Sequence, residues 1–132
     1  IELQHGRGET VLIVEDEQDI RELIEAIFSE QDDYEIFCAG DSWEALSIIY
    51  SGKPDIIILD VNLPALSGYS LCKMVKDDPA MKKTIILMLS GMAQKDDRLR
   101  ALAAGADSYL TKPFSTQELM DTVQKLVEER LA

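Results

Sequence analysis

The sequence has few of the features that mark secreted or membrane-spanning proteins. Its two cysteines, Cys38 and Cys72, lie far apart among apolar neighbours and form no CxxC pair. This spacing favours buried, reduced thiols in a cytoplasmic protein over a single disulfide. No apolar run approaches the ~20 residues that a membrane-spanning helix needs, and there is no signal peptide. We therefore expect a cytoplasmic domain that makes no contact with a membrane.

Basic residues are also scarce. The chain has 13 Lys and Arg against 25 Asp and Glu, which gives a formal net charge of −12. Binding to a phosphate backbone needs a basic face, so the charge argues against a direct nucleic-acid partner. It allows cations and basic protein surfaces as partners, although a negative surface also simply keeps a small domain soluble.

The length of 132 residues and the hydrophobic content of 46% fit one domain with a full core. Because the chain begins with Ile1 rather than Met, we expect a piece of a longer or processed protein. Residues 1–9 contain two glycines and no periodicity, which predicts a leader or linker. Residues 10–132 are expected to form the domain.

Beyond residue 9, strand-like and helix-like segments alternate. The strands are expected at residues 10–14, 34–39, 55–59, 84–89 and 108–111. These runs are rich in β-branched and aromatic residues. Three of them are continuously apolar, which is typical of strands covered on both faces.

Apolar residues at helical spacing lie between and after these runs. They are Ile20, Leu23, Ile24, Ile27 and Phe28 in the first helix, Ala45, Leu46 and Ile49 in the second, Leu71, Cys72 and Val75 in the third, Leu99, Leu102 and Ala103 in the fourth, and Leu119, Val123, Leu126 and Val127 in the fifth. Residues 41–44 and 115–118 predict capping boxes, and Gly105 predicts a helix end. The alternation predicts an α/β fold, a doubly wound five-stranded parallel sheet with five helices on its two faces.

Acidic residues follow two of the expected strands. In open α/β sheets, ligands bind at the carboxyl ends of the strands, where the strand order reverses. Glu15 and Asp16 follow the first strand, and Asp60 ends the third. Two unit charges ~4 Å apart repel by ~4 kcal/mol at an effective dielectric of ~20. Lys112 offsets part of this repulsion and Mg²⁺ offsets more, so the pattern predicts a metal site with a carboxylate beside it.

Taken singly, each of these residues has a plain structural alternative. The acids could be solvated or could cap the next helix, and Lys112 could be an ordinary surface lysine. Asp60 could begin a turn ahead of Pro64 and Gly68. Their joint occurrence at the strand ends, with Ser90 after the fourth strand, favours a functional site.

Four segments together carry a family resemblance: "VLIVEDE", "PDIIILDVNLPALSG", "TIILMLSG" and "AAGADSYLTKPF". In this order and spacing, over about residues 10–130, the chain resembles the receiver domain of two-component response regulators. The resemblance implies the strand order 2-1-3-4-5 and transfer of a phosphoryl group to Asp60. The donor would be a phosphohistidine on a histidine kinase or a histidine phosphotransfer protein. It also implies a switch that phosphorylates and dephosphorylates itself, rather than an enzyme.

The resemblance further implies a role for each matching residue. Asp60 would be the phosphoacceptor, and the Mg²⁺ ligands would be Glu15 through water, Asp16, Asp60 and the backbone carbonyl of Asn62. The phosphoryl group would be stabilised by Lys112, Ser90 and Gly91, and the switch would consist of Ser90 and Tyr109. Pro113 would have a structural role in a Lys-Pro junction that is often cis. The face formed by the fourth helix, fifth strand and fifth helix would control a partner or output domain. Formation of a homodimer on phosphorylation is a further alternative.

Three other functions share parts of this pattern. A pseudo-receiver that only docks usually lacks a key residue, and this sequence lacks none. An aspartyl-phosphate hydrolase of the haloacid dehalogenase class would have a second Asp where Asn62 stands. A flavodoxin-like electron carrier would have a phosphate-binding loop in place of residues 15–17. The leader resembles the junctions before receivers in hybrid histidine kinases, and a free-standing receiver or an excised regulator domain also fits.

Overall fold

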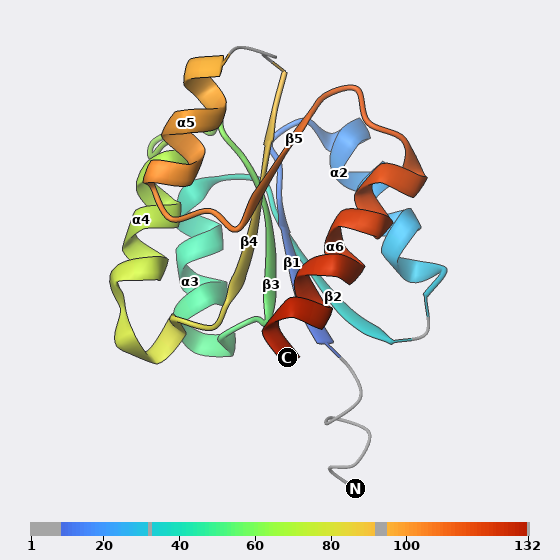
Figure 1. Cartoon of the computed structure of the whole chain (residues 1–132), viewed down its shortest axis with the longest axis horizontal. Helices are drawn as coiled ribbons and strands as arrows, with labels where there is room; N and C mark the ends of the chain where they lie inside the picture. The colour runs from blue at the N-terminus through green and yellow to red at the C-terminus, as the bar shows by residue number, and fades with distance from the viewer. Residues whose placement is uncertain (1–8, 32, 92–94, 132) are drawn as a thin grey trace, which may run out of the picture.

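The computed structural model describes residues 9–31, 33–91 and 95–131. These residues form β1 Glu9–Val14, α2 Gln18–Ser29, β2 Tyr34–Ala39, α3 Ser42–Gly52, β3 Ile56–Asp60, α4 Gly68–Asp77, the 3-10 helix η1 Pro79–Met81, β4 Ile85–Ser90, α5 Lys95–Ala103, β5 Ser108–Thr111 and α6 Thr116–Leu131 (Figure 1). The strands pair in parallel in the order β2-β1-β3-β4-β5. The predicted fold class and strand order are confirmed. Most of the predicted leader, residues 1–8, lies outside the described residues.

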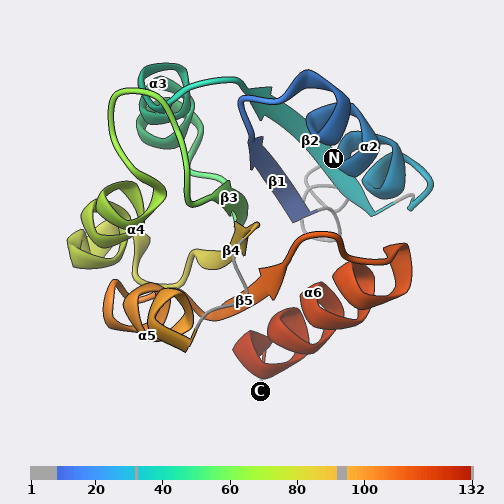
Figure 2. The ribbon, with the colours of Figure 1, turned by 90° about the horizontal axis from the view of Figure 1, so that it is seen from above.

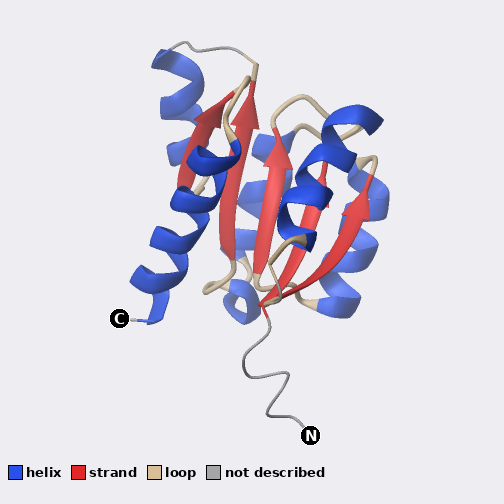
Figure 3. Cartoon of the chain, turned by 90° about the vertical axis from the view of Figure 1, so that its right-hand side faces the viewer, coloured by secondary structure: helices blue, strands red, loops and turns tan. Residues whose placement is uncertain are grey.

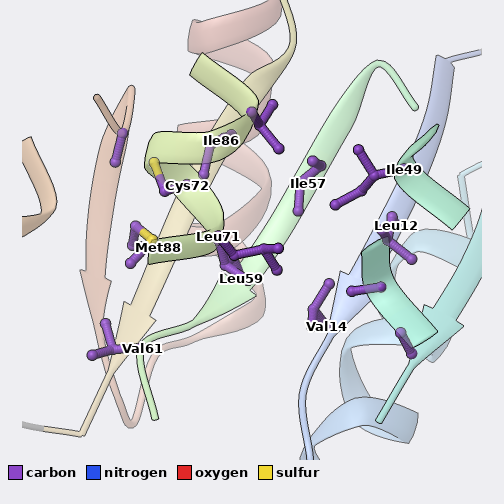
Figure 4. Close-up of a cluster of buried hydrophobic side chains, with 14 of the residues drawn as sticks. Leu12, Val14, Ile49, Ile57, Leu59, Val61, Leu71, Cys72, Ile86 and Met88 are labelled. Carbon is purple, nitrogen blue, oxygen red and sulfur yellow. The ribbon is translucent and has the colours of Figure 1, made fainter. Parts of the chain in front are cut away.

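Helices cover both faces of the sheet. Figure 2 shows α3, α4 and α5 on one side of the strands and α2 and α6 on the other. In β3, Ile57 and Leu59 face the first side, where Ile49 and Leu71 also pack (Figure 4). Ile56 and Ile58 face the second side, in a separate cluster with Phe28. A large apolar side chain contributes ~1.5–3 kcal/mol when fully buried. Residues 56–59 of β3 are all apolar because the strand contributes to two cores, and only Asp60 at its end is charged.

The predicted helix signals lie at helix ends. The Asp41 carboxylate accepts a hydrogen bond from the Glu44 N–H at 2.8 Å and caps α3. Before α6, Ser115 Oγ accepts from the Glu118 N–H at 3.0 Å, and Glu118 Oε1 accepts from the Ser115 N–H at 2.9 Å. This reciprocal pair is a complete capping box. Gly105 follows α5 with a φ of 101°, in the left-handed region that favours glycine.

Four residues of the predicted core are exposed in the structure. Leu23 in α2 and both Leu99 and Leu102 in α5 have about half of their surface exposed, and Ala103 in α5 is exposed as well. For α5 the reason is its position, because it packs against the edge strand β5 and buries Ala101 instead. Strand β1 also begins at Glu9, one residue earlier than expected.

The two thiols are free, as the spacing predicts. Cys72 is buried in α4, whereas Cys38 is only half-buried on the edge strand β2. The prediction of a buried thiol is therefore right for Cys72 and only partly right for Cys38.

Candidate functional site

Three carboxylates meet at one edge of the sheet. Strands β1 and β3 are neighbours, so their carboxyl ends lie side by side, and Figure 3 shows all the strand arrows pointing to that edge. Glu15, Asp16 and Asp60 each place a carboxylate oxygen within 4.8 Å of the others. Glu15 and Asp60 are buried, whereas Asp16 is exposed. The predicted convergence of acids is therefore found, with one side open to solvent.

Lys112 lies beside these carboxylates. Its Nζ is 2.8 Å from Glu15 Oε1 and 3.4 Å from Asp60 Oδ1. Its backbone N–H donates to the Ser90 carbonyl at 2.7 Å, which extends the pairing of β4 with β5 and carries Lys112 to the site. The nearer partner of Lys112 is therefore Glu15 rather than Asp60. Lys112 offsets one of the three negative charges.

Burial and the neighbouring charges both shift the pKa values of the buried groups at this site. Burial raises the pKa of Glu15 to about 7, and the nearby Asp60 charge acts in the same direction, while the hydrogen bond from Lys112 opposes them. Burial acts to lower the pKa of Lys112, but its bond to Glu15 and the Asp60 charge outweigh that effect and raise it. Lys112 is therefore a cation, and the site as a whole favours bound positive charge.

The backbone after Asp60 is tightly constrained. The Gly68 N–H donates to the Val61 carbonyl at 2.8 Å, so the first residue of α4 lies against the end of β3. A Cβ atom on Gly68 would lie 2.2 Å from the Asp60 carbonyl oxygen, so only glycine fits there. Asn62 is exposed, two residues beyond Asp60.

The remaining predicted residues lie on β4, β5 and the segments that follow them. Ser90 is buried at the end of β4, and Gly91 after it is exposed. Tyr109 is half-buried in β5 and packs against the core on the α3, α4 and α5 side. Pro113 follows Lys112 through a cis peptide bond, as the resemblance implies.

Two further residues hold the loops of the site, and sequence reasoning missed both. The Arg21 guanidinium in α2 donates to the Glu15 carbonyl at 2.8 Å and thereby fixes the segment after β1. The Ser42 hydroxyl is buried against the loop after β3. A helical arginine and a serine beside a capping residue are common, so neither carries a distinctive sequence signal.

Comparison with known proteins decides the family. The family model described as the response regulator receiver domain matches residues 11–124. The chain belongs to this family. Over 113 residues the receiver domain is 42% identical to the phosphate regulon transcriptional regulatory protein PhoB of Pseudomonas aeruginosa, and the match covers 86% of this chain and 49% of PhoB. The receiver domain thus spans about half the length of this curated relative.

Two solved structures are similar to the receiver domain over most of its length. A putative response regulator from Chloroflexus aurantiacus is 38% identical with a TM-score of 0.87, and the match covers 92% of this chain and 98% of that one. The receiver domain of a sensor histidine kinase from Pseudomonas aeruginosa is 30% identical with a TM-score of 0.83 and the same coverages. That structure has a magnesium ion coordinated in its active site cleft.

Fold, site and family together define this chain. It is a two-component receiver domain with an acidic pocket of Glu15, Asp16 and Asp60 for phosphoacceptor signalling. Among the described helices, none combines the length and the apolar character that crossing a bilayer requires.

Proposed function

We propose that this receiver domain accepts a phosphoryl group on Asp60 in a magnesium-dependent phosphorelay and then switches conformation to control a partner or output domain. The observation that carries the proposal is the meeting of three carboxylates within 4.8 Å, with the Lys112 ammonium beside them. The donor would be a phosphohistidine on a histidine kinase or a histidine phosphotransfer protein. The free thiols of Cys38 and Cys72 suit a cytoplasmic location, because reduced thiols persist there.

The donor set fits Mg²⁺. This hard cation prefers oxygen ligands, takes one or two carboxylates and keeps several waters. Asp16 would bind it directly and Glu15 through water, and Asp60 and the Asn62 carbonyl would complete the set. The exposure of Asp16 leaves an open side for the waters. When bound, the ion would neutralise charge on the phosphoryl oxygens.

Phosphoryl transfer needs a positioned nucleophile more than covalent help. An oxygen of the Asp60 carboxylate would attack phosphorus in line as the bond from phosphorus to the histidine nitrogen breaks, and the histidine would keep the electron pair. Lys112 Nζ, 3.4 Å from Asp60 Oδ1, lies where it can balance an incoming phosphoryl oxygen. Ser90 and the Gly91 backbone would donate hydrogen bonds to the other oxygens.

The new charge would drive the switch. A phosphate adds roughly −1.5 to −2 charge at neutral pH, and the Ser90 hydroxyl would move toward it. Tyr109 would turn inward as Ser90 moves and so change the face formed by α5, β5 and α6. Leu99 and Leu102 on α5 are exposed and offer that face an apolar contact with an output domain, a partner or a second phosphorylated copy.

The test is phosphorylation by a small donor. With acetyl phosphate and Mg²⁺, intact-mass spectrometry should find one added phosphate on the wild type and none on Asp60→Asn. Asp41→Asn is the matched control, because Asn caps a helix as well as Asp and this carboxylate lies at the start of α3. Equal labelling of the wild type and Asp60→Asn would refute the assignment, and an unlabelled wild type would leave the pseudo-receiver as the function.

The switch and the hydrolase alternative need separate measurements. Ser90→Ala and Tyr109→Ala should still be labelled but should weaken the response of a partner in a reconstituted relay. Normal signalling by both variants would reject the switch. Steady turnover of an added phosphomonoester by the wild type would support an aspartyl-phosphate hydrolase instead.

A further inference from the structure

We propose that Ser42 is a positioning residue for the phosphorylation site. Its buried hydroxyl holds the loop after Asp60 in one shape and thereby fixes Asn62, whose backbone carbonyl would bind the cation. This inference rests on the proposed magnesium-dependent function. It adds a residue from α3, an element that supplies none of the acids, the lysine or the switch residues.

The Ser42 hydroxyl forms hydrogen bonds with the loop after β3. Ser42 is the first residue of α3 and has no exposed surface. Its Oγ lies 2.9 Å from the Pro64 carbonyl oxygen and 2.6 Å from the Leu66 carbonyl oxygen, and it accepts from the Leu66 N–H at 3.2 Å. A hydroxyl has one proton, so it donates to one of these carbonyls at a time while it accepts from Leu66. Ser42 thus ties α3 to residues 64–66.

The loop needs this support because its tip is strained. Ala65 has a φ of 75°, and the Leu66 N–H donates to the Pro64 carbonyl at 3.0 Å across it. Such a three-residue turn with a positive central φ is rare. A left-handed conformation costs a residue with a Cβ ~1–2 kcal/mol, and it persists only where the surrounding structure imposes it. In this loop, Ser42 supplies hydrogen bonds on both sides of Ala65.

The position of Asn62 links this loop to the chemistry. The loop is held at its base by the bond from the Gly68 N–H to the Val61 carbonyl and at its tip by Ser42. Asn62 lies between these two attachments. A metal ligand must be held to within a fraction of an ångström, and loss of the groups that orient ligands typically costs 10–100-fold in metal affinity.

A simpler role for Ser42 would be to start helix α3. That role already belongs to Asp41, whose carboxylate accepts from the Glu44 N–H. The Ser42 hydroxyl instead bonds to the loop 22 and 24 residues away in the sequence. Removal of the hydroxyl should therefore loosen the loop and leave the start of the helix intact.

The first test measures Mg²⁺ binding by isothermal titration calorimetry. Ser42→Ala should bind Mg²⁺ about tenfold more weakly than the wild type. Ser67→Ala is the matched control, because Ser67 lies at the end of the same loop, where its hydroxyl caps α4 and accepts from the Ser70 N–H. The control should bind within about twofold of the wild type, since loss of a cap lowers stability without moving residue 62. Equal affinities for Ser42→Ala and the wild type, or equal weakening by both variants, would overturn the proposal.

The second test needs no metal. Amide hydrogen exchange, followed by NMR in EDTA, should be faster at Leu66 in Ser42→Ala than in the wild type, and unchanged at Glu44. An unchanged rate at Leu66 would overturn the positioning role. If Ser42→Ala does not fold, Ser42→Cys provides the same comparison, because a thiol has nearly the same shape but is a weak hydrogen-bonding group. A wild type that binds no Mg²⁺ and accepts no phosphate would instead reject the proposed function, and with it this inference.

Discussion

Gly68 begins α4 at the place where this helix lies against the strand end that carries Asp60. The distance of 2.2 Å from a Cβ atom to the Asp60 carbonyl oxygen leaves no room for any side chain. The obstacle is a backbone atom at the end of a buried strand, so it cannot rotate away. A Cβ atom placed on Gly91, after β4, meets no atom of the described residues within 4 Å, so they impose no such constraint there. Two glycines on the same edge of the sheet therefore serve different purposes.

We predict that Gly68→Ala destabilises the domain and Gly91→Ala does not. The added methyl group on residue 68 must push α4 away from β3, and overpacking of this kind typically costs ~1–3 kcal/mol. Surface changes without such contacts stay within about 0.5 kcal/mol. Urea unfolding of both variants beside the wild type measures the difference. Matching unfolding midpoints for the two variants would contradict the close packing at Gly68.

We predict slow, strongly pH-dependent alkylation of the two thiols. Burial, followed by the Glu25 charge, raises the pKa of Cys38 to about 11, and burial raises that of Cys72 to about 12. The thiolate is the reactive form, so below its pKa the rate should rise about tenfold per pH unit. Mass spectrometry with iodoacetamide from pH 8 to 10, on Cys38→Ser and Cys72→Ser, separates the two sites. A rate at Cys38 that levels off below pH 9 would contradict the raised pKa.

At the scale of the elements, the patterns that predicted best are those that local chemistry determines. The apolar run of β3 and the capping residues Asp41 and Ser115 all lie where the sequence indicates, because burial on two faces and orphan helix N–H groups impose them. The apolar spacing in α5 predicted a buried stripe, and this prediction is wrong because Leu99 and Leu102 are half exposed. How much of a helix is covered depends on its place over the sheet, which helical spacing does not encode.

At the end of α3, the glycine stands one residue before the position that adopts the left-handed conformation. Gly52 is the last helical residue, and nothing lies within 4 Å of a Cβ placed on it. Lys53 follows in the left-handed conformation with a φ of 45° and donates its N–H to the Ile49 carbonyl. Glycine inside a helix costs ~0.5–1 kcal/mol relative to alanine, and a left-handed residue with a Cβ costs ~1–2 kcal/mol.

We therefore predict that Gly52→Ala and Lys53→Gly each stabilise the domain, by about 0.5–1 kcal/mol. Because the two substitutions act on adjacent residues, the double variant is measured as well as each single one. Thermal and urea unfolding should both move to higher midpoints. A lower midpoint for Lys53→Gly would mean that the lysine side chain makes a stabilising contact that outweighs the backbone cost.

On the scale of the whole molecule, charges are paired differently at the amino edge of the sheet, where the strands begin, and at the carboxyl edge, where they end. At the amino edge, Arg130 of α6 pairs with Glu9 of β1 and donates to the Asp55 carbonyl, so the last helix is tied to the first strand by matched charges. At the carboxyl edge, three carboxylates face Lys112. Three carboxylates thus lie around one lysine at the site, whereas Glu9 at the amino edge has an arginine of its own.

The strand order is enough to predict that the three carboxylates meet, but it does not predict which of them pairs with Lys112. Once β1 and β3 are neighbours, Glu15, Asp16 and Asp60 must meet, so the convergence could be predicted from strand ends alone. The preference of Lys112 for Glu15 over Asp60 could not. It depends on the three-dimensional placement of the two carboxylates, since the side chain of Glu15 is one methylene longer than that of Asp60 and places its carboxylate farther from the backbone.

We predict that Mg²⁺ stabilises the whole domain, because the cation relieves repulsion that the fold otherwise contains. A ligand at one hundred times its Kd stabilises by about 2.7 kcal/mol, so the urea midpoint should rise with Mg²⁺ and fall again with EDTA. Asp16→Asn should respond much less to Mg²⁺ and should be more stable than the wild type in EDTA, since it lacks one of the repelling charges. Asp41→Asn, which keeps all three carboxylates, should respond like the wild type. Superimposable unfolding curves for the wild type in Mg²⁺ and in EDTA, at equal ionic strength, would show that the carboxylates at this edge are stable without a cation.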